Sequence, residues 1–328
     1  MLRYFDEPYL HNAQYLHIKM VCGASFYPST CQSPIELLRC SALAASMLDT
    51  QTKPQRTVFY SEDILRLYQR QDSIRKAIPA LFSSDQLALA FQAQLSVTSG
   101  KIIGCEALIR WNHPVLGPVR PDEFIPLLKD FGMLDKLGRF VITQAIKFLE
   151  RNGARLRLLS PSFSLSINLS ADELANAALI DLLGASLREH RIAENLLTVE
   201  LTEFSAVESF QKANSVFDKL HAQGVSIAID DFGTGFSSLS YLLELSSDKI
   251  KIDRSFIARY PDAESITIYK TVMLLAKELG ATVVAEGVEN QEQLDFLSSI
   301  GCDEYQGYYF SAAVDEKVFL KQIEQVNI

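Results

Sequence analysis

From about residue 86 onward, the sequence alternates short runs of β-branched and apolar residues with longer stretches of helical periodicity. This order is typical of a parallel sheet whose strands are joined by helices. The predicted strands cover residues 88–97, 102–109, 163–168, 196–201, 225–230, 249–252, 281–285 and 302–306. The predicted helices cover residues 135–151, 171–188, 206–223, 263–279, 290–299 and 315–326. Seven or eight such strands favour a (β/α)₈ barrel of the TIM type over an open sheet.

The first two predicted strands are joined differently from the others. Only Thr98, Ser99, Gly100 and Lys101 separate them, and four residues cannot form a helical crossover. We therefore expect an antiparallel hairpin at the start of an otherwise parallel barrel. Glycines at 224, 280 and 301 stand where helix C-caps are expected.

The first part of the chain has a different pattern, with strand-like runs at 14–21, 23–27 and 57–60 and a helix over 34–47. Residues 61–80 predict one amphipathic helix. We therefore divide the chain into a small α+β segment (1–60), a linker helix (61–85) and a barrel (86–328).

Composition and charge exclude several classes of protein. With 48% hydrophobic and 22% charged residues among 328, the chain has the composition of a globular domain, not of a disordered or collagenous chain. No apolar run reaches the length of a membrane span, and the first residues lack a signal peptide, so we expect a cytoplasmic protein. The net charge of −9 disfavours DNA binding. The five cysteines are scattered, which argues against a disulfide framework and a zinc site.

Polar side chains recur at the carboxyl ends of the predicted strands, where barrel enzymes place their active sites. They are Glu106, Asn168, Glu200, Asp230, Asp231, Lys251, Asp253 and Glu286. Six carboxylates in one pocket repel one another unless cations neutralise them. Because the candidate ligands are all oxygen donors, the sequence predicts Mg²⁺ or Mn²⁺ rather than Zn²⁺.

Each of these residues also has a simpler interpretation. A single acid at a strand end can be a helix N-cap or an exposed residue, and Asp230-Asp231 can initiate a turn before Phe232-Gly233. Lys251 is either a buried charge partner or a group that holds or deprotonates water and stabilises developing phosphorane charge. Arg110, close to Glu106, is suited to bind a phosphate, whereas we expect Trp111 to pack in the core.

Seven motifs in order identify a family. They are E-A-L-I-R-W, S-I-N-L-S, E-L-T-E, D-D-F-G-T-G-F-S-S-L, K-I-D-R-S-F-I, A-E-G-V-E and Q-G-Y-Y-F-S, from Glu106 to Ser311. Over residues 86–326 the chain resembles the EAL-domain phosphodiesterases of bacteria. The resemblance implies hydrolysis of cyclic di-GMP to linear pGpG with two divalent ions. The alternative is a weakly catalytic receptor for cyclic di-GMP that signals through protein contacts.

The resemblance also implies roles for individual residues. Glu106, Asn168, Glu200 and Asp230 would bind one ion, and Asp230, Asp231 and Glu286 the other. Lys251 would orient the water. Lys251, Asp231 and Glu286 would be the catalytic residues. Gln92, Leu108, Arg110, Asp253 and Gln306 would line the substrate site. Glu203 would brace the D-F-G-T-G-F-S-S-L loop, which in the family shapes metal binding and the contact of a homodimer through the barrel.

Some positions depart from the family pattern. Phe91-Gln92-Ala93 replaces Tyr-Gln-Pro, Leu127-Leu128-Lys129 stands where Leu-Ala-Glu is expected, and Ala312-Ala313 replaces Lys-Pro. None of these changes removes an expected metal ligand.

The front segment resembles the last third of a GGDEF cyclase domain. The G-G-D-E-F signature is absent, and Ser41–Ser46 read S-A-L-A-A-S where such domains carry A-D-x-A-M-Y. We interpret residues 1–60 as a truncated, degenerate GGDEF segment that does not bind GTP.

Overall fold

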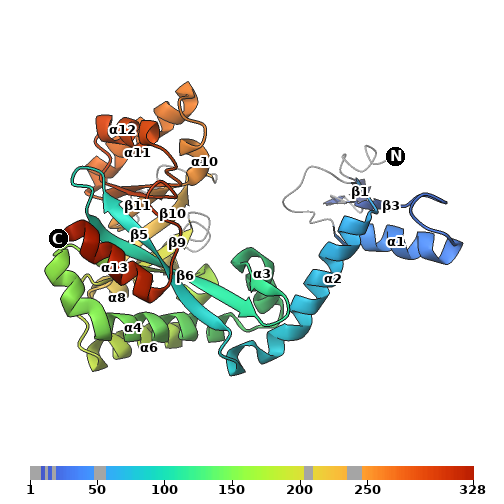
Figure 1. Cartoon of the computed structure of the whole chain (residues 1–328), viewed down its shortest axis with the longest axis horizontal. Helices are drawn as coiled ribbons and strands as arrows, with labels where there is room; N and C mark the ends of the chain where they lie inside the picture. Colours follow the sequence, from blue (N-terminus) through green and yellow to red (C-terminus); the bar gives the residue numbers. More distant parts are fainter. Residues whose placement is uncertain (1–8, 12–13, 17–19, 48–56, 203–209, 235–245) are drawn as a thin grey trace. The chain divides into compact units, whose positions relative to one another are not determined.

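The computed structural model describes the chain except for residues 1–8, 12–13, 17–19, 48–56, 203–209 and 235–245. The chain divides into two compact units, residues 1–81 and residues 82–328 (Figure 1).

The second unit contains a closed eight-stranded barrel, as predicted. Its strands are β5 (Leu87–Ser96), β6 (Ile102–His113), β8 (Ser164–Asn168), β9 (Leu197–Thr202), β10 (Ser226–Phe232), β11 (Lys249–Ile252), β12 (Thr282–Glu286) and β13 (Glu304–Gln306). The strands pair in chain order, and β13 returns to β5 to close the barrel. Strand β5 is antiparallel to both of its neighbours, β6 and β13, which confirms the predicted hairpin. A short strand, β7 (Gly117–Val119), extends the sheet beside β6.

The helices of this unit follow the predicted order, with three differences. They are α3 (Pro121–Asp130), α4 (Leu134–Leu159), α5 (Ala171–Leu174), α6 (Ala177–Glu189), α8 (Phe210–His221), α10 (Arg254–Ile257), α11 (Ala263–Leu279), α12 (Gln291–Ser299) and α13 (Glu316–Asn327). The predicted helix 171–188 is two helices, because the Asn176 side chain accepts a hydrogen bond from the Ala178 amide and starts α6 anew. Two helices were not predicted from the sequence: α3, which contains Pro126, and the four-residue α10.

Glycine ends α11 as the sequence predicted. Gly280 is the C-cap of α11 and has a φ of 68°, in the left-handed region that favours glycine. Gly224 and Gly301, which follow α8 and α12, have φ values of 72° and 74°. These glycines therefore turn the chain from each helix into the next strand of the barrel.

Aromatic side chains fill the space between the barrel and its outer helices. The Phe91 ring of β5 stacks on Phe148 of α4 with centroids 4.4 Å apart, and Phe319 of α13 lies 6.0 Å from Phe91. Trp111 is buried, and its indole nitrogen donates to Gln86 Oε1 at 2.9 Å. The expectation that Trp111 packs in the core is thus confirmed. All five cysteines are free thiols.

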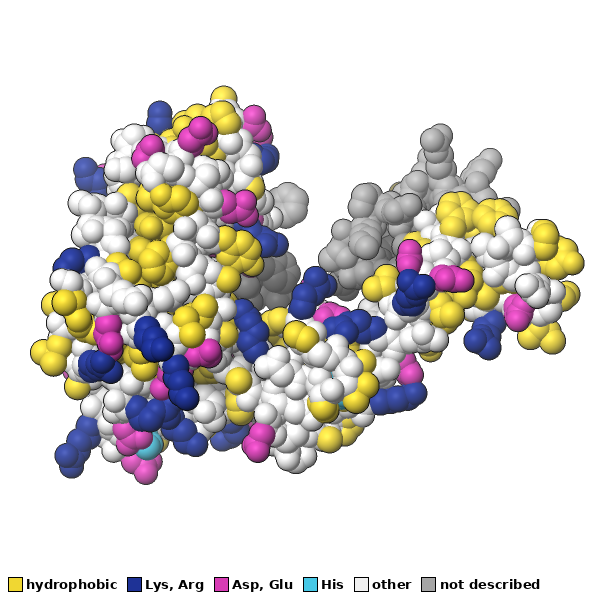
Figure 2. Space-filling model, viewed as in Figure 1, with side chains coloured by type: hydrophobic (Ala, Val, Ile, Leu, Met, Phe, Trp, Pro, Cys, Tyr) yellow, Lys and Arg dark blue, Asp and Glu magenta, His cyan; other side chains and the backbone are white. Residues whose placement is uncertain are grey.

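The first unit is small and carries many exposed apolar side chains. It contains the antiparallel pair β1 (Tyr9–His11) and β2 (Gln14–Leu16), the parallel pair β3 (Cys22–Ala24) and β4 (Thr57–Phe59), and helices α1 (Pro34–Ser46) and α2 (Glu62–Ala77). A 3₁₀ turn over Ile78–Ser83 follows α2. Hydrophobic side chains gather on this unit in Figure 2, and Ile35 and Leu38 of α1 are 80% and 74% exposed. None of the described helices has both the length and the hydropathy that a membrane crossing needs.

The last helix is tied to the start of β6 by one buried amide. Asn327 Oδ1 accepts from the Ile102 amide at 2.9 Å, and its Nδ2 donates to the Ile102 carbonyl at 2.8 Å. The helix α13 also packs on β5 and β6. Asn327 therefore ties the end of α13 to the backbone of β6 through both of its side-chain polar atoms.

We predict that Asn327→Ala lowers the free energy of unfolding by about 1–3 kcal/mol, because the substitution removes two hydrogen bonds from the backbone of buried Ile102. Urea denaturation followed by circular dichroism measures the loss. Gln325→Ala changes an exposed residue of the same helix and serves as the control. Equal stability of the two variants would contradict the bridging role of Asn327.

Candidate active site

The acidic side chains predicted at the strand ends converge at one mouth of the barrel. Glu106 comes from β6, Glu200 from β9, Asp230 and Asp231 from β10, and Glu286 from β12. Asn168 ends β8 and lies opposite Glu200 in the register of the two strands. Because the strands are parallel, their carboxyl ends meet on the same side of the sheet. The fold therefore brings together residues that lie up to 180 positions apart.

Lys251 lies at the centre of this cluster and is only 1% exposed. Its Nζ lies 2.5 Å from Glu200, 2.7 Å from Glu286, 3.0 Å from Asp230 and 3.5 Å from Glu106. A single ammonium thus contacts four carboxylates from four different strands. These carboxylates hold the pKa of Lys251 well above its ordinary value, against the opposing effect of burial.

One ammonium cannot neutralise four carboxylates, so protons make up part of the difference. Burial raises the pKa of Glu200 to about 8 and that of Glu286 to about 7, although Lys251 opposes both shifts. Glu106 behaves differently. Burial acts to raise its pKa, but the charge of Lys251 and hydrogen bonds from Gln306 and Asn168 bring it below the ordinary value.

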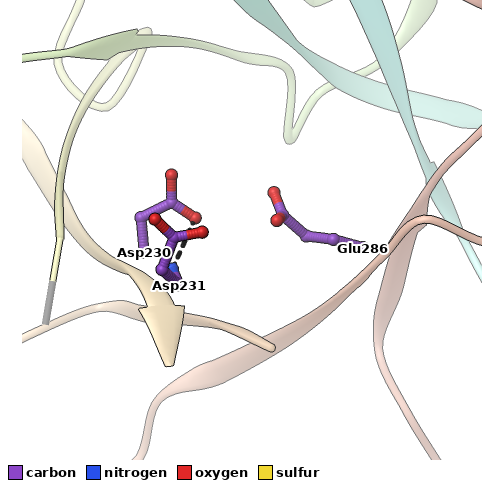
Figure 3. Close-up of side chains that lie close together, drawn as sticks. All are labelled: Asp230, Asp231 and Glu286. Atoms are coloured by element: carbon purple, nitrogen blue, oxygen red, sulfur yellow. Dashed lines mark hydrogen bonds between the residues drawn. The ribbon is translucent and has the colours of Figure 1, made fainter. Parts of the chain in front are cut away.

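A bulge in β10 brings the two neighbouring aspartates to the same site. Ile229 pairs with Ile250 and Phe232 with Ile252, so Asp230 and Asp231 together face the single residue Lys251 on β11. Asp231 has a φ of 54°, in the left-handed region. In a regular strand, consecutive side chains point to opposite faces, whereas in Figure 3 both aspartates lie on the side that faces Glu286. The Asp231 amide donates to Asp230 Oδ1 at 2.9 Å.

The chemistry of this cluster fits a divalent cation. Asp230, Asp231 and Glu286 each offer a carboxylate oxygen, and these atoms all lie within 4.8 Å of one another (Figure 3). Burial and the charges of Asp230 and Asp253 raise the pKa of Asp231, although Lys251 opposes the shift. Glu200 Oε1 is buried and has no hydrogen-bond partner. These oxygens are ligands of the kind that hard divalent ions take.

Amide side chains hold Glu106 in place from both sides. Asn168 Nδ2 donates to Glu106 Oε1 at 2.6 Å, and Gln306 Nε2 donates to Glu106 Oε2 at 2.7 Å. Gln306 Oε1 in turn accepts from Gln94 at 3.1 Å, and its Nε2 lies 3.1 Å from Gln92 Oε1. The closing strands β5 and β13 therefore position the acid of β6.

Two cavities adjoin the acidic cluster. One, of about 250 Å³, is lined by Gln92, Glu106, Leu108, Asp230, Glu286 and Gln306, and also by Arg254, Gly287, Glu289, Gly307 and Tyr308. The other, of about 550 Å³, is lined by residues of β6, α3 and α4 that are mostly apolar, and it reaches Asn168 and Glu200. Leu108 lines both.

The remaining expected site residues are placed less directly. Arg110 shares the face of β6 that carries Glu106 and Leu108, but it donates to the Ile109 carbonyl at 2.9 Å and lines neither cavity. Asp253 accepts a hydrogen bond from the Ser255 amide and is the N-cap of α10. Glu203 lies outside the described residues.

Three residues that line the smaller cavity were not predicted as site residues: Arg254, Glu289 and Tyr308. The signal was present, because each belongs to a motif used to identify the family. Arg254 follows Asp253 in K-I-D-R-S-F-I, Glu289 ends A-E-G-V-E, and Tyr308 is the first tyrosine of Q-G-Y-Y-F-S.

Comparisons with known proteins agree on one family. The family model described as EAL domain matches residues 71–313. The chain is 30% identical over 326 residues to the bifunctional diguanylate cyclase/cyclic di-GMP phosphodiesterase MucR of Pseudomonas aeruginosa, covering 98% of this chain and 47% of MucR. It is 33% identical over 319 residues to the cyclic di-GMP phosphodiesterase NbdA of the same organism, covering 95% of this chain and 39% of NbdA. The chain thus spans less than half the length of these two relatives.

Solved structures give the same result for the fold. A structure described as PaMucR phosphodiesterase in complex with c-di-GMP superposes with a TM-score of 0.71 at 32% identity, covering 75% of this chain and 99% of that chain. The EAL enzyme Bd1971, in a form bound to cAMP and cyclic di-GMP, gives 0.73 at 31% identity, with 80% and 72% covered.

We predict that the metal-free protein becomes less stable as the pH rises from about 5 to 8. Glu200 and Glu286 have raised pKa values of about 8 and 7, against the ordinary 4.5, so the folded chain keeps protons that the unfolded chain has lost. The free energy of unfolding is then highest near pH 5 and falls as these acids ionise. Denaturation in EDTA across this range measures the slope.

Substitutions sharpen this test. Glu200→Gln replaces a titrating acid by a neutral amide, so its stability should fall less steeply with pH. Glu292→Gln changes an exposed glutamate of α12 and should keep the wild-type slope. Stability that rises between pH 5 and 8 in the wild type would show that the buried acids are ionised throughout.

Proposed function

The chain belongs to the EAL-domain family, and we propose that it is a metal-dependent phosphodiesterase that hydrolyses cyclic di-GMP to linear pGpG. The observation that carries the proposal is the set of four carboxylates around Lys251, with Asp231 beside them, at the mouth of the barrel. The names of the relatives MucR and NbdA, and the bound c-di-GMP of the PaMucR structure, support the choice of substrate.

We propose two ions, Mg²⁺ or Mn²⁺, held by oxygen ligands. Glu106, Asn168, Glu200 and Asp230 would hold one ion, and Asp230, Asp231 and Glu286 the other. The unpartnered Glu200 Oε1 and the close oxygens of Asp230, Asp231 and Glu286 support this division. When bound, the ions would polarise a phosphate oxygen and lower the pKa of a bound water.

The chain's own groups would complete the reaction. Because its pKa is raised, the Lys251 ammonium in the metal-free chain keeps its proton, which supports holding water or stabilising phosphorane charge over deprotonating the water. Gln92, Leu108 and Gln306 line the smaller cavity and are suited to contact the nucleotide. Arg110 would bind a phosphate and Asp253 would lie near the substrate, each after a change of its present contact.

The rest of the chain has roles that we propose on sequence resemblance. Residues 1–60 would be a degenerate GGDEF segment that does not bind GTP, and residues 61–85 would link it to the barrel. The barrel would form a homodimer, and Glu203 would brace the loop that shapes the metal site and the dimer contact. Sedimentation of residues 82–328, a compact unit by itself, tests the dimer.

The first experiment is incubation of the protein with cyclic di-GMP and Mg²⁺ or Mn²⁺, followed by chromatography for pGpG. We predict cleavage that stops in excess EDTA and is poorly supported by Ca²⁺, because Ca²⁺ is larger and takes looser coordination than a two-metal site allows. Full turnover in EDTA would rule out the metal-dependent mechanism. Tight binding of cyclic di-GMP without cleavage would favour the receptor instead.

We predict that Asp230→Asn lowers turnover of cyclic di-GMP by about 10²–10⁴-fold, because Asp230 is the proposed ligand of both ions and the loss corresponds to several kcal/mol of transition-state stabilisation. Nucleotide affinity should fall far less, since the base contacts do not depend on this carboxylate. Steady-state kinetics and calorimetry measure the two effects. Asp181→Asn, on the exposed face of α6, is the matched control, and equal turnover in both variants would contradict the role of Asp230.

A further inference from the structure

The smaller cavity beside the acidic cluster has a strongly negative wall with one cation in it. Among the described residues, four carboxylates line it, those of Glu106, Asp230, Glu286 and Glu289, and Arg254 is the only basic residue of the lining. Arg254 begins α10 directly after Lys251-Ile252-Asp253 and is exposed. Arg254 therefore lines the cavity beside the acidic cluster, whereas Lys251 is buried within the cluster and does not line the cavity.

Arg254 has no ion-pair or hydrogen-bond partner for its side chain among the described residues. The contrast with Arg259, just after the same helix, is clear, because Arg259 pairs with Glu264 at 3.3 Å and lies over the Phe256 ring. Arg254 thus keeps all of its guanidinium donors available to a ligand.

The backbone opposite Arg254 is shaped to accept its side chain. Gly287, directly after Glu286, has a φ of 71°, and a Cβ atom placed on it would lie 2.4 Å from Cβ of Arg254. No larger residue fits there while Arg254 keeps its position. The glycine therefore lets the stem of Arg254 lie against the loop that follows β12, at the wall of the cavity.

The charge of the proposed substrate supplies the reason for this cation. A cyclic dinucleotide carries two phosphates, and the acidic cluster with its ions takes the one that is cleaved. Arg110, which we propose for a phosphate, does not line this cavity, so among the described lining residues Arg254 is the cation that can meet a second phosphate beside Glu289. We propose that Arg254 binds the phosphate of cyclic di-GMP that is not cleaved, an inference that rests on the proposed function. The planar guanidinium can donate two parallel hydrogen bonds to its oxygens.

The experiment compares two ligands that differ only in that phosphate. One is pGpG, and the other is pGpG whose internal linkage is an uncharged methylphosphonate, so that both guanines and the terminal phosphate are kept. Calorimetry is done in Ca²⁺ on the full chain. Arg254→Gln should raise the Kd of pGpG by about 10- to 100-fold and leave the Kd of the analogue within about threefold of wild type. Arg254→Lys, which keeps the charge but loses the planar donor pair, should recover part of the affinity.

Controls separate this proposal from the proposed function. Arg259→Gln should bind both ligands as the wild type does, since Arg259 does not line the cavity. If Arg254→Gln raised the Kd of both ligands equally, Arg254 would contact guanine or support the fold instead of binding the phosphate. An unchanged Kd of pGpG would also overturn the assignment. A wild type that binds pGpG but does not cleave cyclic di-GMP would refute the proposed function and leave the role of Arg254 standing. A wild type that binds neither ligand would refute both.

Discussion

The contact of the Lys251 ammonium with four carboxylates is the interaction on which the site depends. A lysine that is 1% exposed needs opposite charge close by, because a buried unpaired ion costs several kcal/mol. Its partners come from β6, β9, β10 and β12, so each strand must end at the right height for the charges to meet. The barrel is thus held around an ionic centre that is itself incompletely neutralised, which is the condition that favours binding of further cations.

The antiparallel hairpin of β5 and β6, which begins the barrel, also contributes to the site. Because β5 is antiparallel to both neighbours, Gln92 lies opposite Glu106 and beside Gln306 of the last strand. Asn168 and Gln306 donate to Glu106, and Gln306 is hydrogen-bonded in turn to Gln92. The first and last strands of the barrel are therefore tied together at the place where the substrate is proposed to bind.

Much of this arrangement could be predicted from the sequence, because alternation of apolar and helical segments indicates where most strands end and these ends carry polar residues, whereas Glu106 lies inside β6 (Ile102–His113). The Asp230-Asp231 bulge could not be predicted, since it depends on how β10 pairs with β11 and not on either strand alone. The orientation of the Arg110 side chain could not be predicted from the sequence either. Its position on β6 is the same whether the side chain points toward the cavity or donates to the Ile109 carbonyl. Arg254 was overlooked for a related reason, since only the fold shows that Gly287 lies against it.

The left-handed conformation of Asp231 sets protein stability against function at a single position. A non-glycine residue with a φ of 54° carries a conformational cost of about 1 kcal/mol. Burial and the neighbouring charge of Asp230 also disfavour the ionised carboxylate, as its raised pKa indicates. Glycine at this position would relieve both costs and would also remove a carboxylate from the centre. A substitution of Asp231 by glycine is therefore expected to make the protein more thermostable and, at the same time, less able to hold its ions.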